Sequence, residues 1–337
     1  MTISKVRALT AIILAAAACS CSGNNQAKEG EQTDTPSPVA AAIGTFNADS
    51  AYNHIARQVA FGPRVPGSDG HRECADYIIG TLTSQGVDTL IVQTGEVKAF
   101  NGDVLPIKNI IAGFNTRNSK RVLIAAHWDT RPWAEMETNM NLRDMPIPGA
   151  NDGGSGVGVL LEIARNLAIK HPSVGVDLIF FDAEDYGNAD GFGTNPDSWC
   201  LGSQYWVENM TPYSADNLPV YGILLDMVGG RDARFNYEAF SAQNASTPTI
   251  KVWSEAERLG YADIFPRSIG GAATDDHVVL TRAGIPTTDI IEINNVETQT
   301  FPPTWHTHND NMDNIDRNTL KAVGETVLNV IYKEKAF

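Results

Sequence analysis

The sequence predicts one α/β domain with a central, mostly parallel and twisted sheet that helices cover on both faces. Short, apolar, β-prone runs alternate along the chain with segments whose apolar residues recur at helical spacing. Hydrophobic residues make up 42% of the 337 residues and charged residues only 19%. The chain therefore has enough apolar material for a large core and does not have the composition of a disordered protein.

Two helices are predicted at the start of the domain, within residues 48–85. Gly62-Pro63 and Pro66-Gly67 interrupt this region, and such pairs typically end a helix.

Four short, β-prone apolar runs predict buried strands, because each run is flanked on both sides by polar or turn residues. They are residues 107–114, 122–126, 176–181 and 220–225. A helix is predicted between the second and third runs, where apolar residues such as Val157, Leu160 and Leu161 follow the glycine-rich sequence GANDGGSG. Further helices are expected at residues 250–259 and 317–332, and a further strand at residues 287–293.

The start of the chain has the pattern of an export signal. Lys5 and Arg7 precede an apolar stretch that ends in four alanines, followed by Cys19. We interpret residues 1–22 as a lipoprotein-type signal peptide, because this cysteine resembles the acylation site of bacterial lipoproteins. Cys21 is the alternative acceptor, and cleavage without a lipid is the alternative fate. The expected location is the bacterial envelope, with the protein anchored by a lipid and facing the periplasm.

Residues 23–47 predict a flexible tether, since they are rich in Gly, Gln, Thr, Pro and charge and lack apolar periodicity. Residues 48–337 are expected to form a single domain. Its two cysteines, Cys74 and Cys200, could pair in an oxidising compartment or could be small buried hydrophobic residues. The sequence leaves this choice open.

The net charge restricts the partners of the protein. The chain has 25 basic and 40 acidic residues, which gives a formal net charge of -15 at pH 7. This charge repels phosphate backbones and anionic lipid headgroups at long range. We therefore expect no nucleic-acid partner, and contact with a membrane only through the lipid anchor.

Acidic and imidazole side chains follow the predicted strands at the point where ligands bind in parallel sheets. So many carboxylates in one crevice would raise one another's pKa values unless a cation lay among them. A divalent metal is therefore expected. The residues concerned are His127, Asp129, Asp152, Asp182, Glu184, Asp185, Asp226 and, near the end of the chain, His306.

Imidazole with carboxylates and no thiolates suits zinc or a neighbouring divalent metal. The nearest single-metal set is Asp152, Asp185 and His306, which leaves an open position for catalysis. Glu184, next to a ligand, is placed to move protons rather than to bind the metal. Taken singly, Asp152 could instead cap the following helix, and His127 could be a structural residue.

The order of these motifs resembles the zinc aminopeptidase superfamily, which also contains the glutaminyl cyclases. The resemblance runs from about Ala48 to the end of the chain. It implies a phosphorylase/hydrolase-like, three-layer α/β/α domain. In aminopeptidases of this kind five side chains hold two metals, and the matching residues here are His127, Asp152, Asp185, Asp226 and His306.

Longer motifs are similar to the animal-type glutaminyl cyclases, namely VLIAAHWDTRPW, FFDAEDYG, LLDMVGG, the run Asp275-Asp276-His277 and PTWHTHNDNMDNID. This resemblance implies one zinc on Asp152, Asp185 and His306, with Glu184 as proton shuttle. Asp226 and Asp275 match the acids that hold the substrate amide, although Asp276 could take the place of Asp275. Trp305 matches the aromatic wall of the substrate pocket.

The resemblance thus predicts a zinc-dependent glutaminyl-peptide cyclotransferase, whose partners are peptides or proteins with N-terminal glutamine. A dizinc aminopeptidase is the alternative. The chain departs from the animal enzymes at two positions. Asp185 stands where they have glutamate, and Asp289 stands roughly where they have histidine.

Overall fold

The computed structural model describes residues 45–190, 195–214 and 216–336. The predicted signal peptide, residues 1–22, and residues 23–44 of the predicted tether lie outside this part. Within the described ranges, no helix combines the length and apolar character needed to cross a membrane.

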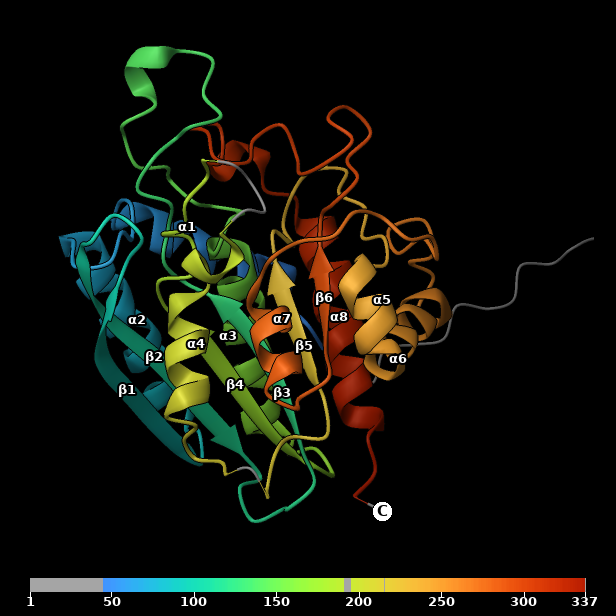
Figure 1. Ribbon diagram of the computed structural model, residues 1–337. Coiled ribbons are helices and arrows are strands. Elements are labelled where there is room, and N and C mark those ends of the chain that lie inside the picture. Colours follow the sequence, from blue (N-terminus) through green and yellow to red (C-terminus); the bar gives the residue numbers. More distant parts are fainter. Residues whose placement is uncertain (1–44, 191–194, 215, 337) are drawn as a thin grey trace, which may run out of the picture. The chain divides into compact units, whose positions relative to one another are not determined.

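The domain is built on a sheet of six strands in the order β1-β2-β4-β3-β5-β6 (Figure 1). Four neighbouring strands, β4, β3, β5 and β6, run parallel. β1 and β2 add to this group as an antiparallel hairpin. The strands are β1 Thr89–Lys98, β2 Val104–Phe114, β3 Arg121–His127, β4 Gly175–Phe181, β5 Gly222–Asp226 and β6 Thr287–Ile291.

The predicted mostly parallel sheet is confirmed, with two differences at one edge. The strand expected at residues 107–114 begins earlier, at Val104, and is antiparallel to its neighbours. β1 was not predicted. Its residues alternate between exposed and partly buried because it forms the edge of the sheet, so it lacks the continuous apolar run that marks the inner strands.

Helices cover both faces of the sheet, as predicted, and form three layers (Figure 1). On β3, Val122 and Ile124 face one core and Leu123 and Ala125 face the other. The first core includes residues from α1 Ala48–Ala60, α2 Asp69–Gln85, α3 Gly154–Ile169, α6 Ser246–Arg258 and α8 Arg317–Lys333. The second face carries α4 Leu201–Glu208 and α7 Asp276–Arg282, and the short α5 Ala239–Asn244 packs near the β6 edge.

The predicted helices are confirmed, with small shifts at their ends. The interruption between α1 and α2 falls at the expected Gly and Pro residues. The short helices α4, α5 and α7 were not predicted. In α4, Trp206 is fully buried against Phe181 and Tyr213 and is therefore a packing residue.

The carboxyl ends of the four parallel strands meet at one edge of the sheet, and α3 begins there. Its N-cap is Gly153, whose φ of 70° favours glycine. At Gly156 a Cβ atom would lie 2.3 Å from the carbonyl oxygen of Leu225, so this glycine lets α3 pack closely against β5. The glycine-rich opening therefore brings Asp152 to the strand ends.

Candidate active site

The three predicted metal ligands meet at the carboxyl edge of the sheet. Nε2 of His306 lies 3.3 Å from Oδ1 of Asp185 and 3.7 Å from Oδ2 of Asp152. One ligand atom from each residue lies within 4.8 Å of the other two, and all three side chains are buried. They come from the loop after β6, the loop after β4 and the turn before α3.

These distances fit a single zinc ion. Two atoms bound to one tetrahedral zinc at about 2.0–2.2 Å lie roughly 3.4 Å apart. Oδ2 of Asp185 is also buried without a hydrogen-bond partner, which is unfavourable unless a cation or proton satisfies it. Two carboxylates and an imidazole, with no thiolate, are a donor set that zinc accepts.

Asp152 does not cap α3. Gly153 occupies the N-cap position of the helix, and no side chain caps it. The backbone amides of Asn151 and Asp152 donate hydrogen bonds of 2.7 and 3.0 Å to the two carboxylate oxygens of Asp310. Asp310 therefore fixes the turn that carries Asp152, a role the sequence analysis did not find.

Two aspartates fix the loop that carries Glu184 and Asp185. The carboxylate of Asp129 accepts hydrogen bonds from the backbone amides of Glu184 at 3.0 Å and Asp185 at 3.2 Å. Asp182 accepts from the backbone amides of Ala183 and Lys108. Asp182 is thus a structural acid of this loop, and Asp129 supports the site from the end of β3.

A second side chain missed by the sequence analysis contacts the predicted metal site. Oε1 of Glu135 lies 2.7 Å from Nδ1 of His306. Arg131 donates from Nε to both carboxylate oxygens of Glu135 and from Nη1 to the carbonyl oxygen of Asp185. Glu135 lies in an irregular loop, where no periodic pattern marks it.

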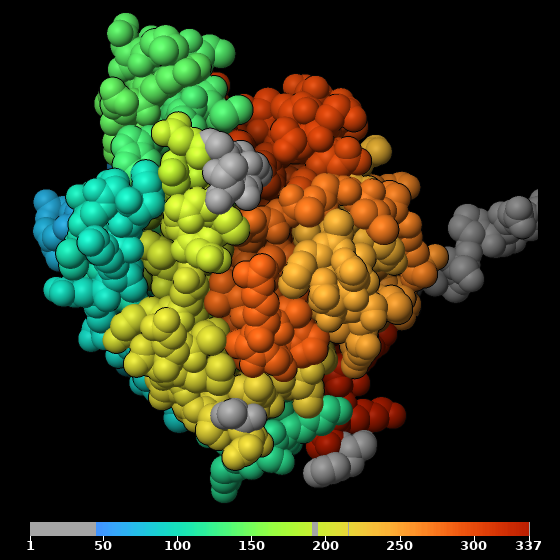
Figure 2. Space-filling model, viewed as in Figure 1, coloured from blue at the N-terminus to red at the C-terminus, as the bar shows by residue number. Residues whose placement is uncertain are grey.

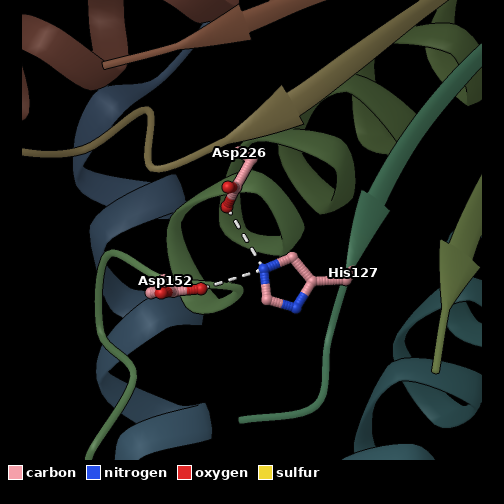
Figure 3. A group of neighbouring side chains, drawn as sticks. All are labelled: His127, Asp152 and Asp226. Atoms are coloured by element: carbon pink, nitrogen blue, oxygen red, sulfur yellow. Dashed lines mark hydrogen bonds and ion pairs between the residues drawn. The ribbon is translucent and has the colours of Figure 1, made fainter. Parts of the chain in front are cut away.

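His127 forms a second buried group with Asp152 and Asp226 (Figure 3). Its Nε2 atom lies 3.1 Å from Oδ1 of Asp152 and 3.2 Å from Oδ1 of Asp226. Burial favours the neutral ring, but the carboxylates of Asp129, Asp152 and Asp226 outweigh it and raise the pKa of His127 well above its ordinary value. The two oxygens of Asp152 therefore face two different imidazoles.

Glu184 lies beside these groups and is buried. Burial raises the pKa of Glu184 well above its ordinary value; His127 opposes this effect, while Asp275 and Asp185 add to it. Sγ of Cys200 donates to Oε1 of Glu184 at 3.4 Å. Burial also raises the pKa of Asp226 to about 7, with His127 opposing and Asp152 and Asp275 adding to the shift.

A cavity of about 40 Å³ opens onto the predicted site. Trp305 stacks on His306 with ring centroids 3.7 Å apart, and Trp199 lies parallel to His306 at 6.2 Å. The cavity is lined by Asp152, Glu184, Asp185, Pro196, Trp199, Asp226, Met227, Ala273, Thr274, Asp275, Ile291, Phe301, Trp305 and His306. The structure thus brings all seven predicted site residues together.

Three open questions from the sequence are answered by position. Asp275, the N-cap residue of α7, lines the cavity, whereas the fully buried Asp276 does not. Cys74 and Cys200 are both free thiols, so they do not pair. Asp289 is buried behind the site, where its Oδ2 atom lies 3.3 Å from Nδ1 of His277.

The fold and this arrangement of carboxylates and imidazoles define a metal-dependent α/β enzyme. Comparison with known families agrees with that class. Residues 109–331 match the model of peptidase family M28, and the chain belongs to this family.

Some of the similar solved structures are named glutaminyl cyclases, and others are named exopeptidases. A glutaminyl cyclase from Tannerella forsythia is 50% identical, with a TM-score of 0.82 over 86% of this chain and 100% of that chain. A structure described as a Zn-dependent exopeptidase from Parabacteroides distasonis is 48% identical, with a TM-score of 0.82 over 87% of this chain and 100% of that chain.

More distant relatives also include both cyclotransferases and aminopeptidases. The glutaminyl-peptide cyclotransferase of Bos taurus is 24% identical over 292 residues, which are 76% of this chain and 74% of that protein. An aminopeptidase of Bacillus subtilis is 28% identical over 262 residues, which are 75% of this chain. The match spans only 48% of that aminopeptidase, about half of its length.

Proposed function

We propose that this protein is a zinc-dependent glutaminyl-peptide cyclotransferase. It converts the N-terminal glutamine of peptides and proteins to pyroglutamate and releases ammonia. One observation carries the proposal: the predicted ligands Asp152, Asp185 and His306, the base Glu184 and the acids Asp226 and Asp275 all line one narrow cavity. The named cyclases at about half identity support the same assignment.

Asp152, Asp185 and His306 would hold one zinc ion, which supplies Lewis-acid polarisation of the side-chain amide carbonyl. Glu184 acts as the proton shuttle. It accepts a proton from the α-amine as that nitrogen bonds to the amide carbon, and it returns the proton to the side-chain nitrogen that leaves as ammonia. The raised pKa of Glu184 suits both steps, because the same group must take up a proton and release it.

Asp226 and Asp275 orient the amide. Asp275 lies at the start of α7, with a carboxylate oxygen within 4.8 Å of a carboxylate oxygen of Glu184. The charge of Asp275 also raises the pKa of Asp226, so one proton shared between the two acids lowers their repulsion. An acid that keeps its proton donates to the amide oxygen, and an ionised acid accepts from the amide nitrogen.

The aromatic walls keep water away from the reacting carbon. Trp305 and Trp199 line the cavity together with Phe301. Water excluded from this space cannot compete with the α-amine, and such competition would yield glutamate instead of the ring.

A dizinc aminopeptidase is the second candidate, and the group His127, Asp152 and Asp226 favours it because it could hold another metal. We favour one metal, because the resemblance to the glutaminyl cyclases implies a single zinc on Asp152, Asp185 and His306. Several of the structures at about half identity are named glutaminyl cyclases.

We also propose that the protein is exported and anchored to a membrane by a lipid on Cys19, facing the periplasm. The leader pattern described above supports this location. Labelling of the wild-type protein with a radioactive fatty acid, and loss of the label in Cys19→Ala, would test it. If Cys19→Ala keeps the label, the lipid is not attached to Cys19, and Cys21 becomes the proposed acceptor.

The product formed from a glutamine-initiated dipeptide tests the activity. Purified protein with Gln-Gly should release ammonia and leave a product that retains both residues. The same peptide acetylated at its α-amine should not react, because it has no free nucleophile. Release of free glutamine would instead identify an aminopeptidase.

A further inference from the structure

A second pocket adjoins the active-site cavity, between α4 and α7. Its volume is about 320 Å³, against about 40 Å³ for the active-site cavity. The two hollows share the lining residues Pro196, Trp199, Thr274 and Asp275. Figure 1 and Figure 2 show α4 and α7 side by side on one face of the molecule. We call this hollow the α4–α7 pocket.

The size of the active-site cavity limits what it holds. Its 40 Å³ correspond to roughly three water molecules, which is about the room that one side-chain amide needs. The residue that follows the N-terminal glutamine must therefore lie outside. A neighbouring hollow around Phe100 and Trp133 shares no lining residue with the active-site cavity, whereas the α4–α7 pocket shares four.

The α4–α7 pocket is lined by both apolar and polar side chains. Val207 from α4 and Val278 and Val279 from α7 supply apolar surface, and Gln204, Thr274 and the buried Asp275 supply polar groups. Arg282 and Glu208 are exposed at the edge of the pocket. Apolar surface combined with a small number of polar groups is typical of sites that bind a ligand side chain.

We propose that the α4–α7 pocket binds the side chain of the second substrate residue and favours an apolar one. The inference rests on the proposed cyclotransferase function and specifies its substrate class. An apolar side chain removes its own surface and the surfaces of Val207 and Val279 from water. A glycine at the second position gains nothing from this pocket.

The experiment compares ring formation from Gln-Leu amide and Gln-Gly amide. The wild type should convert the leucine substrate with a kcat/KM about tenfold higher, since a side chain of this size typically gives such a difference in an apolar pocket. Intermediate values are expected for Ala and Val at the second position. This series uses only the wild-type protein, so it does not depend on the folding of any variant.

Two variants locate the effect. Val207→Asn and Val279→Asn place an amide on opposite walls of the pocket, and each should reduce the leucine advantage over glycine to about twofold. Val92→Asn is the matched control, because Val92 is a partly exposed valine on β1, which forms the far edge of the sheet. This control should keep the full advantage.

Two results would overturn the inference alone: equal rates with both substrates in the wild type, or an undiminished leucine advantage in both pocket variants. In each case the ring still forms, so the proposed function would stand. Absence of ring formation from every glutamine substrate would refute the proposed function and this inference with it.

Discussion

The carboxylate of Glu135 lies 2.7 Å from Nδ1 of His306, the imidazole expected to bind zinc through Nε2. This contact fixes Nδ1 as the protonated nitrogen and leaves the lone pair of Nε2 facing Asp185 and Asp152. Arg131 in turn holds Glu135 through its guanidinium. The geometry matches the pairing of carboxylate and histidine that orients the ligands of many zinc sites.

Glu135→Gln should weaken zinc binding by about tenfold to a hundredfold, because the neutral amide stabilises the metal-bound imidazole less than the carboxylate does. Competition with a chromogenic chelator measures the change without any assay of activity. Glu137→Gln is the control, since Glu137 accepts a hydrogen bond from the backbone amide of His308 and does not contact His306. An unchanged zinc affinity in Glu135→Gln would remove Glu135 from the site.

Glu184→Gln should lower kcat by at least about a hundredfold while the protein still binds zinc, because the amide cannot shuttle a proton and Glu184 is not a predicted ligand. Metal analysis and the ammonia assay separate these two effects. Glu73→Gln, at an exposed position on α2, should keep its activity. Substantial turnover by Glu184→Gln would exclude this residue as the proton shuttle.

Asp129→Asn should disturb the active-site loop. The carboxylate of Asp129 accepts from the amides of both Glu184 and Asp185, and an asparagine offers only one oxygen. We expect about 1–3 kcal/mol less stability in urea unfolding and a reduced kcat. Asp316→Ala, which removes the side-chain N-cap of α8, should cost stability without reducing kcat. A loss of stability with full turnover in Asp129→Asn would show that the loop does not need this support.

Glu292 should make stability depend on pH. Burial raises the pKa of Glu292 from 4.5 to about 7, with Asn295 opposing and Asp232 adding to the shift. Because the folded state binds the proton more tightly, this stabilisation is complete below pH 4.5 and is lost as the pH rises through about 7.

Glu292→Gln removes this titration, so the variant should gain stability relative to the wild type between pH 5 and pH 8, by up to about 3 kcal/mol. Urea unfolding at the two pH values measures the difference. The hydrogen bond from Asn295 to Glu292 has an acceptor in both proteins, because glutamine retains one carbonyl oxygen. Parallel pH profiles for wild type and variant would contradict the raised pKa.

The inner strands and long helices could be predicted because burial leaves a strong pattern in the sequence. Every residue of β3 is buried, so its apolar run is continuous. The edge strand β1 is half exposed and gives no such run. The helices α4 and α7 are only eight and seven residues long, which is too short for a clear apolar period.

The candidate ligands could be predicted because parallel strands deliver the residues at their ends to one edge. His127 ends β3 and Asp226 ends β5. Glu135 could not be predicted, because its contact with His306 joins residues 171 positions apart through irregular loops. Asp310 was missed for the same reason, since it acts on the turn of Asp152 through backbone amides.

Zinc titration of the metal-free protein tests the central claim most directly, with ring formation from a glutamine-initiated peptide followed at each addition. One ion held by Asp152, Asp185 and His306 predicts that the rate of pyroglutamate formation rises in proportion to added zinc and stops rising at one equivalent. A rate that needs a second equivalent, or free glutamine as the product at any zinc level, would contradict the single-metal cyclotransferase.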